Sequence, residues 1–361
     1  GLFNGRVDFT FDAYYKDTRD MLFKAVLPSQ TGFTTQWQNI GNVINKGLEF
    51  TLNTVNVKHG DFSWSSNLTI DVNRNRVTSL GDGIEYLANP VNKGAFTEEP
   101  TRLIAGQPLG IIWGYEWDGN YQLDEFNIYY KNTDIPVPAE LVTSENYQQM
   151  DFKLKEGVTG MNGVSVKPGD RKFRDLNGDG VVKEDTDKKI IGNSYPKFSY
   201  GFGNTFAWRG LSFYIFLDGV YGRDILNEFK YRTEAGASTA MYNIRSTAYH
   251  NAWRPENGSN SYARLNNQTN CQNVISSFYV EDGSYLRLRT ISLSYSLPSK
   301  ACQAIRFQSL KFTLSAENVA IFSPYSGLDP DISTSNVTFP GLDRMGYPTR
   351  RSFSLGIIAN F

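Results

Sequence analysis

Strict alternation of apolar and polar side chains is the feature that most limits how this chain can fold. It is clearest in the last ten residues, where one phase is apolar throughout: Phe353, Leu355, Ile357, Ala359 and Phe361. The other phase is mostly small or polar. Successive side chains of a strand point to opposite faces, so this segment has one apolar and one polar face. Such a strand fits the edge of a soluble sandwich or the wall of a membrane barrel, and one strand alone does not choose between them.

Seven other segments repeat the pattern and decide between these folds. The eight predicted strands are 6–17, 44–57, 61–75, 196–208, 211–222, 284–297, 308–321 and 350–361. Each has about the ten residues that a tilted strand needs to cross the hydrocarbon core. The polar phase is rich in Ser, Thr, Gly, Asn and Asp, which suits the wall of a water-filled lumen. The fold class predicted is therefore all-β: a transmembrane antiparallel β-barrel segment of about eight strands.

The connections between these strands alternate in length. Three are short (58–60, 209–210 and 298–308), and four are long (18–43, 76–195, 223–283 and 322–349). Short periplasmic turns and long extracellular loops are typical of bacterial outer-membrane barrels. Residues 1–361 are therefore interpreted as one barrel segment, with 76–195 as a long extracellular loop region and 223–283 as a second long extracellular loop. Residues 108–117 look like a strand, but a ninth spanning strand would break the alternation, so we assign them to the first loop.

Composition excludes several classes of protein. The 361 residues have a formal net charge of −1, which excludes a strongly basic nucleic-acid surface. No apolar run reaches the roughly 18 residues of a transmembrane helix. The chain opens without a secretory signal, so we expect it to start at a processed end or inside a longer protein. The two cysteines, Cys271 and Cys302, fall at opposite ends of the predicted barrel, and we expect no disulfide between them.

Two arginines depart from the alternation. Arg287 and Arg289 are in phase with the apolar residues Ile291 and Leu293. An arginine that faces lipid near the bilayer midplane costs about 2–4 kcal/mol. We therefore expect both arginines near the extracellular rim, or paired with acidic loop residues.

An enzymatic function is not expected. The chain has two histidines, His59 in a short turn and His250 in a long loop, which are too far apart for one metal site. It has no nucleophile elbow, phosphate-binding loop or dinucleotide fingerprint. Its carboxylates are not placed as an acid–base pair.

One loop resembles the first half of a calcium-binding loop. Asp175, Asn177 and Asp179 alternate before Gly180, and Asp185 and Asp187 flank the place of the closing ligand. Carboxylate and amide oxygens at this spacing suit calcium, and glycine permits the sharp bend. The competing interpretation is an Asx-turn loop without metal, because Asp, Asn and Gly are common turn residues. No cofactor is required by either interpretation.

Aromatic residues gather in the long loops. We predict that Trp113, Tyr115, Trp117 and Trp253 contact substrate, because aromatic faces stack on sugar rings or on apolar side chains. The alternative is that these residues pack the loops together or meet a partner protein.

A series of phrases resembles the SusC-like TonB-dependent transporters of Bacteroidetes outer membranes, in matching order along the whole chain. They include Tyr14–Thr18, Asn39–Val43, Asn45–Phe50, Gly106–Gly110, Gly114-Tyr115, Pro168–Asp170, Asp175–Gly180, Ile191–Asn193, Pro196–Phe198, Val280–Leu288 and Tyr325–Pro330. The resemblance implies the C-terminal part of a barrel of about 22 strands, without the N-terminal plug, the TonB-contacting segment and the early strands.

The same resemblance implies a function. It implies TonB-dependent uptake of oligosaccharides or peptides across the bacterial outer membrane, with a SusD-like surface lipoprotein as lid. The other partners would be the rest of the transporter, TonB through the N-terminal part, and membrane lipid, but no nucleic acid. Two alternatives stay open: a soluble β-sandwich that binds carbohydrate, and a surface glycan hydrolase with two convergent carboxylates.

Overall fold

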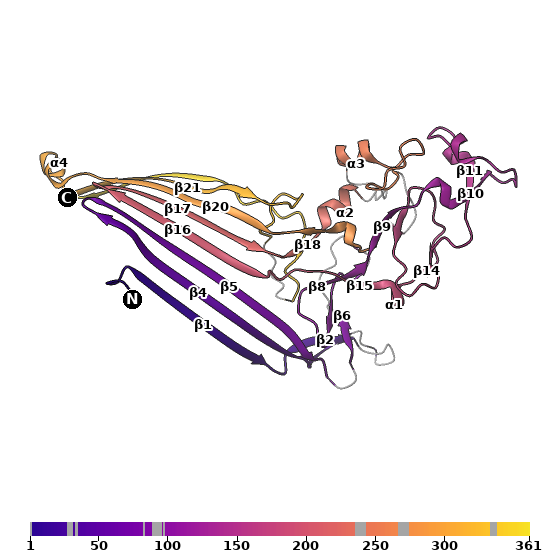
Figure 1. Ribbon diagram of the computed structural model, residues 1–361, viewed down its shortest axis with the longest axis horizontal. Coiled ribbons are helices and arrows are strands. Elements are labelled where there is room, and N and C mark those ends of the chain that lie inside the picture. The colour runs from indigo at the N-terminus through magenta and orange to yellow at the C-terminus, as the bar shows by residue number, and fades with distance from the viewer. Residues whose placement is uncertain are drawn as a thin grey trace.

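The computed structural model contains one large sheet and a folded group of loops at one end of it (Figure 1). It describes residues 2–26, 32, 35–81, 84–88, 96, 98–234, 243–265, 274–332 and 338–361. The sheet has eight antiparallel strands in the order in which they occur along the chain. They are β1 (Val7–Thr18), β4 (Asn42–His59), β5 (Phe62–Ser79), β16 (Phe198–Trp208), β17 (Leu211–Tyr221), β20 (Tyr285–Ser296), β21 (Ser309–Phe322) and β23 (Ser352–Asn360). All eight predicted strands are confirmed.

The two ends of the sheet differ as the connection lengths predicted. Both chain termini and the short connections lie at one end, and the long connections gather at the other (Figure 1). Helix α4 (Ser299–Ala304) occupies the longest of the short connections and buries Cys302. Cys271 lies outside the described residues, so the expectation about a disulfide stays a prediction. None of the described helices is both long and apolar enough to span a bilayer.

The register shows that each face of the sheet has one chemical character. Trp64, Phe206, Phe213, Leu293 and Leu314 are direct cross-strand neighbours on five successive strands. This apolar face is bare: for example, Phe353 and Leu355 are each 75% exposed. Soluble monomers rarely expose so large an apolar surface. A β-sandwich would need a second sheet packed against this face. The described residues form no such sheet, so the alternative of a β-sandwich is wrong.

Aromatic side chains mark both ends of the apolar face. At the loop end, the rings of Phe198 and Tyr221 stack with centroids 5.2 Å apart. At the turn end, Trp64 stacks on Phe206 at 5.6 Å, and Trp208 is 53% exposed. Aromatic side chains at both ends of an apolar strand face are typical of barrels that cross a membrane.

The long connections fold into a compact unit, which we call the loop module: the described residues of 19–41, 80–197, 222–284 and 323–351. Its strands are β2 (Leu22–Val26), β3 (Thr35–Asn39), β6 (Tyr86–Ala88), β7 (Arg102–Ile104), β8 (Ile111–Tyr115), β9 (Trp117–Asn120), β10 (Phe126–Tyr130), β11 (Met150–Leu154), β12 (Gly160–Met161), β13 (Arg171–Phe173), β14 (Val181–Val182), β15 (Lys188–Asn193), β18 (Asp224–Asn227), β19 (Val280–Asp282) and β22 (Leu342–Asp343). Its helices are α1 (Glu184–Asp187), α2 (Glu228–Glu234) and α3 (Ser246–Asn251), with 3₁₀ turns at Leu123–Glu125, Ala139–Leu141, Tyr147–Gln149 and Ser277–Tyr279. Strand β8 pairs with β15 inside the module, so the assignment of residues 108–117 to the loop is confirmed.

Separate connections share hydrophobic cores within the loop module. One core brings together Ile112, Leu226, Ile275 and Leu342, which come from three different long connections. The backbones of two of these connections approach so closely that position 114 requires glycine. A Cβ there would lie 2.4 Å from the Ile275 carbonyl oxygen. A second core buries Val43 and Val77, the ends of β4 and β5, and this burial explains why both strands run past their predicted ends.

Candidate functional site in the polar face of the sheet

The polar face of the sheet brings carboxylates from neighbouring strands into one row. Asp12 pairs with Glu49 across β1 and β4, and Glu49 pairs with Asp71 across β4 and β5. Like charges that are directly opposite in a sheet destabilise it. Neither Glu49 nor Asp71 forms an ion pair with a described residue, and Asp71 only accepts a 3.4 Å hydrogen bond from the Ser199 hydroxyl. The row is thus a patch of uncompensated negative charge.

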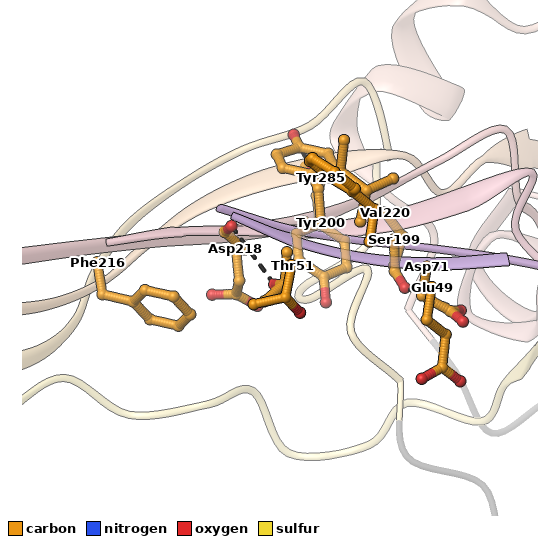
Figure 2. Close-up of a pocket in the computed structure, with 14 residues that line it drawn as sticks. Glu49, Thr51, Asp71, Ser199, Tyr200, Phe216, Asp218, Val220 and Tyr285 are labelled. Carbon is orange, nitrogen blue, oxygen red and sulfur yellow. Dashed lines mark hydrogen bonds between the residues drawn. The ribbon is translucent and has the colours of Figure 1, made fainter. Parts of the chain in front are cut away.

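A hollow of about 540 Å³ lies over this part of the polar face. Figure 2 shows Glu49, Asp71 and Asp218 pointing to the same side of the sheet, with Phe216 next to Asp218. No Lys, Arg or His belongs to its lining among the described residues. A cleft lined by charges of one sign concentrates ions of the opposite sign near its wall. The geometry therefore favours cationic over anionic ligands in this hollow.

An ion network closes the loop end of the polar face. Arg289 makes two hydrogen bonds to the Asp218 carboxylate, at 2.7 and 2.6 Å. Arg287 donates to Asp329 at 2.7 Å and forms an ion pair with Asp331 at 3.2 Å. The network ties the segment that follows β21 to two wall strands. The expected pairing of both arginines with acidic loop residues is confirmed by their contacts with Asp331.

The predicted phase of these arginines is wrong, and a β-bulge is the reason. Thr290 pairs with Phe216 and Leu288 with Leu217, which leaves Arg289 without a partner on β17. One extra residue moves everything beyond it to the opposite face. Arg287 consequently pairs with Asp218 on the polar face instead of following Ile291 on the apolar face.

Asp329 anchors the segment after β21. Its carboxylate accepts hydrogen bonds from Arg287, from the backbone N–H groups of Asp331 and Thr349, and from the Thr349 hydroxyl. Burial alone would raise the pKa of Asp329, but these donors outweigh it and hold the pKa below its ordinary value. The carboxylate is thus kept charged within the network.

Of the four aromatic residues predicted to contact substrate, Tyr115 and Trp253 lie in a core of the loop module and Trp117 packs against it. Tyr115 and Trp253 are buried, with 4% and 3% of their surface exposed. Trp117 and Trp113 are half-buried. The Trp117 ring meets the edge of Phe278 with centroids 5.1 Å apart, and Arg102 lies over the Trp113 ring. The structure places all four in packing contacts, and their contact with substrate stays a prediction.

The predicted calcium residues are divided between two hydrogen-bonded turns. The Asp175 carboxylate accepts from the backbone N–H groups of Gly178 and Gly180, both at 2.7 Å, and Asp179 pairs with Lys183 at 2.5 Å. Asn177 caps the N–H of Asp179 at 2.9 Å.

The other two predicted ligands lie further along this loop. Asp187 is buried and accepts from the backbone N–H groups of Leu176 and Lys183, whereas Asp185 is exposed. Among the residues described, no group of three acidic, His or Cys side chains is arranged around a cation site. Calcium binding by Asp175, Asn177, Asp179, Asp185 and Asp187 stays a prediction.

Comparison with known proteins agrees with the geometry. No family model matches the chain. TonB-dependent receptor P3 of Formosa agariphila is 31% identical over 367 residues, which covers 100% of this chain and 33% of that protein. TonB-dependent receptor SusC of Bacteroides thetaiotaomicron is 24% identical, again over 100% of this chain and 31% of that protein. The solved structure of the RagAB peptide transporter matches 99% of this chain and 34% of its own, with a TM-score of 0.73 and 21% identity.

Over its whole length the chain is similar to SusC-like TonB-dependent receptors. The resemblance read from the sequence is thereby confirmed. The chain spans about a third of the length of the curated relatives it matches.

Sequence reasoning missed the residues that line the hollow in this SusC-like sheet. Asp71 falls in the polar phase of its predicted strand, but alternation does not reveal which carboxylates become neighbours. Glu49, Asp71 and Asp218 lie up to about 170 positions apart and meet only through the strand register. The length of the short turns could have revealed these neighbours, because turn length fixes the register of each hairpin.

Proposed function

We propose that this SusC-like segment forms part of the wall of an outer-membrane importer. Its apolar face would contact lipid and its polar face would line the passage for cargo. The long connections would lie at the cell surface, where a SusD-like lipoprotein would cover the barrel. Uptake of oligosaccharides or peptides would be driven through TonB, which would act on the part of the transporter that contains the plug.

One observation carries this proposal: the sheet has a bare apolar face and a polar face rich in hydroxyl, amide and carboxylate groups. A wall between lipid and water needs this division, because the barrel meets hydrocarbon outside and water inside. The relatives support the transport function, since they are named TonB-dependent receptors and the RagAB structures are titled a peptide transporter or peptide importer. These titles leave both oligosaccharide and peptide cargo open for this chain.

Cysteine labelling of the complete transporter tests the orientation of the wall. Leu68 and Thr69 are neighbours on β5 that belong to opposite faces. We expect Thr69→Cys to react with a charged maleimide and Leu68→Cys to react only with a lipid-soluble one. The assignment of the faces would be contradicted if the charged maleimide reacted with Leu68→Cys and did not react with Thr69→Cys. The parent protein gives the background from its own cysteines.

Uptake into whole cells tests the transport step and separates the two cargo classes. Cells that carry the complete transporter would receive a fluorescent peptide digest or fluorescent maltooligosaccharides. We expect one of these probes to accumulate, and to do so only in cells with functional TonB. Accumulation that persists without TonB, or no accumulation of either probe, would refute the proposed function.

A further inference from the structure

Two aromatic side chains lie side by side on the polar face of β17. The rings of Tyr214 and Phe216 have centroids 6.4 Å apart and planes within 7° of parallel. They share a face because they are two positions apart on one strand. We call this pair of nearly parallel rings the aromatic ledge.

Glycines on the neighbouring strand leave room for the two rings. A Cβ at Gly201 would lie 3.2 Å from the Phe216 ring, and a Cβ at Gly203 would lie 3.4 Å from the Tyr214 hydroxyl. The rings therefore lean over the bare backbone of β16 instead of standing away from the wall. Both side chains remain half-exposed on the polar face of the sheet.

The aromatic ledge joins two hollows of the polar face. Phe216 lines the hollow of about 540 Å³ together with Glu49, Asp71 and Asp218. Tyr214 lines a second hollow of about 300 Å³, which also contains Asn67. Arg289 neutralises Asp218, whereas Glu49 and Asp71 have no cationic partner among the described residues. The larger hollow thus combines a half-exposed aromatic side chain with two uncompensated carboxylates.

We propose that the aromatic ledge is a subsite for the ammonium or guanidinium group of a peptide cargo. This proposal rests on the proposed function, and it assigns a lysine- or arginine-containing peptide as the class of cargo. A cation over an aromatic face is attracted by the ring quadrupole, and the attraction grows as water is excluded. Glu49 and Asp71 add Coulomb attraction that a neutral sugar would not receive. Charge complementarity therefore favours a basic peptide over a neutral oligosaccharide at this position.

A structural role for the rings is the competing explanation, because aromatic side chains often cover glycines in curved sheets. Phe216→Leu separates the two roles: leucine still covers Gly201 but has no aromatic face. Tyr214→Phe keeps both rings and serves as the matched control for the ledge. Glu317→Gln removes a polar-face carboxylate on β21 outside the hollow and controls for general charge.

The experiment uses the complete transporter, purified in detergent, and two capped pentapeptides that differ only in a central lysine or glutamine. Calorimetry should show tighter binding of the lysine peptide, by about tenfold, and this preference should weaken with added salt. We expect Phe216→Leu and Asp71→Asn each to reduce the preference by about fivefold, while Tyr214→Phe and Glu317→Gln leave it unchanged. Heat-modifiable mobility in gel electrophoresis confirms that each variant has assembled.

Three results would overturn the assignment of the ledge: no measurable binding of the lysine peptide, a lysine preference that survives Phe216→Leu, or tighter Phe216-dependent binding of maltopentaose. The uptake assay separates this failure from failure of the importer itself. TonB-dependent accumulation of a probe without lysine preference would refute only the ledge. Loss of TonB dependence would refute the importer, whatever the peptides show.

Discussion

Removing the Arg287 guanidinium should release the segment after β21 from the wall. The side chain is 2% exposed and contacts both Asp329 and Asp331, whose side chains are 14% and 36% exposed. Removing one partner of a buried ion pair costs about 3–5 kcal/mol, because the other charge is left without compensation. In Arg287→Met, Asp329 still accepts hydrogen bonds from the Thr349 hydroxyl and from two backbone N–H groups. We therefore expect a cost at the lower end of this range, about 3 kcal/mol.

A cost of this size has a measurable effect on local opening. About 1.4 kcal/mol corresponds to a factor of ten, so the open population of residues 323–332 should rise roughly 100-fold. Hydrogen exchange followed by mass spectrometry on the purified protein measures this rise. The reporters are the amides of Asp331, which donates to Asp329 at 2.9 Å, and Ser326, which donates to Glu281 at 2.8 Å.

Two other arginines provide a graded control. The Arg289 side chain is 38% exposed and its partner Asp218 is 17% exposed, so solvent screens the pair and Arg289→Met should cost about 1 kcal/mol. Arg209 and Asp61 form a pair that is 68% and 62% exposed, and Arg209→Met should leave exchange in 323–332 unchanged. Exchange in Arg287→Met that matches Arg209→Met would refute the claim that the buried network holds this segment.

Three further predictions follow from the fold. The hydrogen bonds that lower the pKa of Asp329 contribute stability above the ordinary carboxyl pKa of about 3.9, and this contribution is lost as pH falls through the lower folded-state value. Relative to the intrinsic exchange rate at each pH, the protection of amides in 323–332 should therefore fall below about pH 4, while that of the wall strands stays unchanged. Phe202→Arg places a charge on the apolar face between Leu68 and Leu217, and it should cost about 2–4 kcal/mol near the midplane and reduce the heat-modifiable, assembled form; normal assembly would mean that this face is misassigned. Gly114→Ala would bring a Cβ to 2.4 Å from the Ile275 carbonyl, so limited proteolysis should show a loosened loop module around an intact sheet; unchanged proteolysis would contradict the close packing described there.

Much of the sheet was predictable because its information is local. Period-two alternation marks each strand, and connection length distinguishes the two ends of the sheet. The strand ends were less predictable, since Val43 and Val77 extend β4 and β5 by packing into a core built from distant residues. The bulge at Arg289 was not predictable, because Arg287, Arg289 and Ile291 keep a regular spacing in sequence while the backbone does not.

The candidate site was less predictable than the fold because it depends on register. Glu49 and Asp218 belong to strands that never pair directly, and only the order and offsets of the strands between them bring both to one hollow. The aromatic ledge depends in addition on Gly201, which in sequence reads only as a small residue in the polar phase. Composition pointed instead to the aromatic residues of the loops. Of these, Tyr115 proved to be part of a hydrophobic core, and Trp117 packs against that core.

The shared cores of the loop module limit how the sequence of this chain can diversify. Ile112, Leu226 and Leu342 come from three separate connections but fill one interior, so none of these connections can be remodelled without its neighbours. A chimera that takes a single loop from a relative would replace the core side chains of one connection only. The side chains of the other two connections would then face partners with which they do not pack. Grafting all the long connections as a set would preserve those contacts, and the hairpin turns at the other end could remain those of the host.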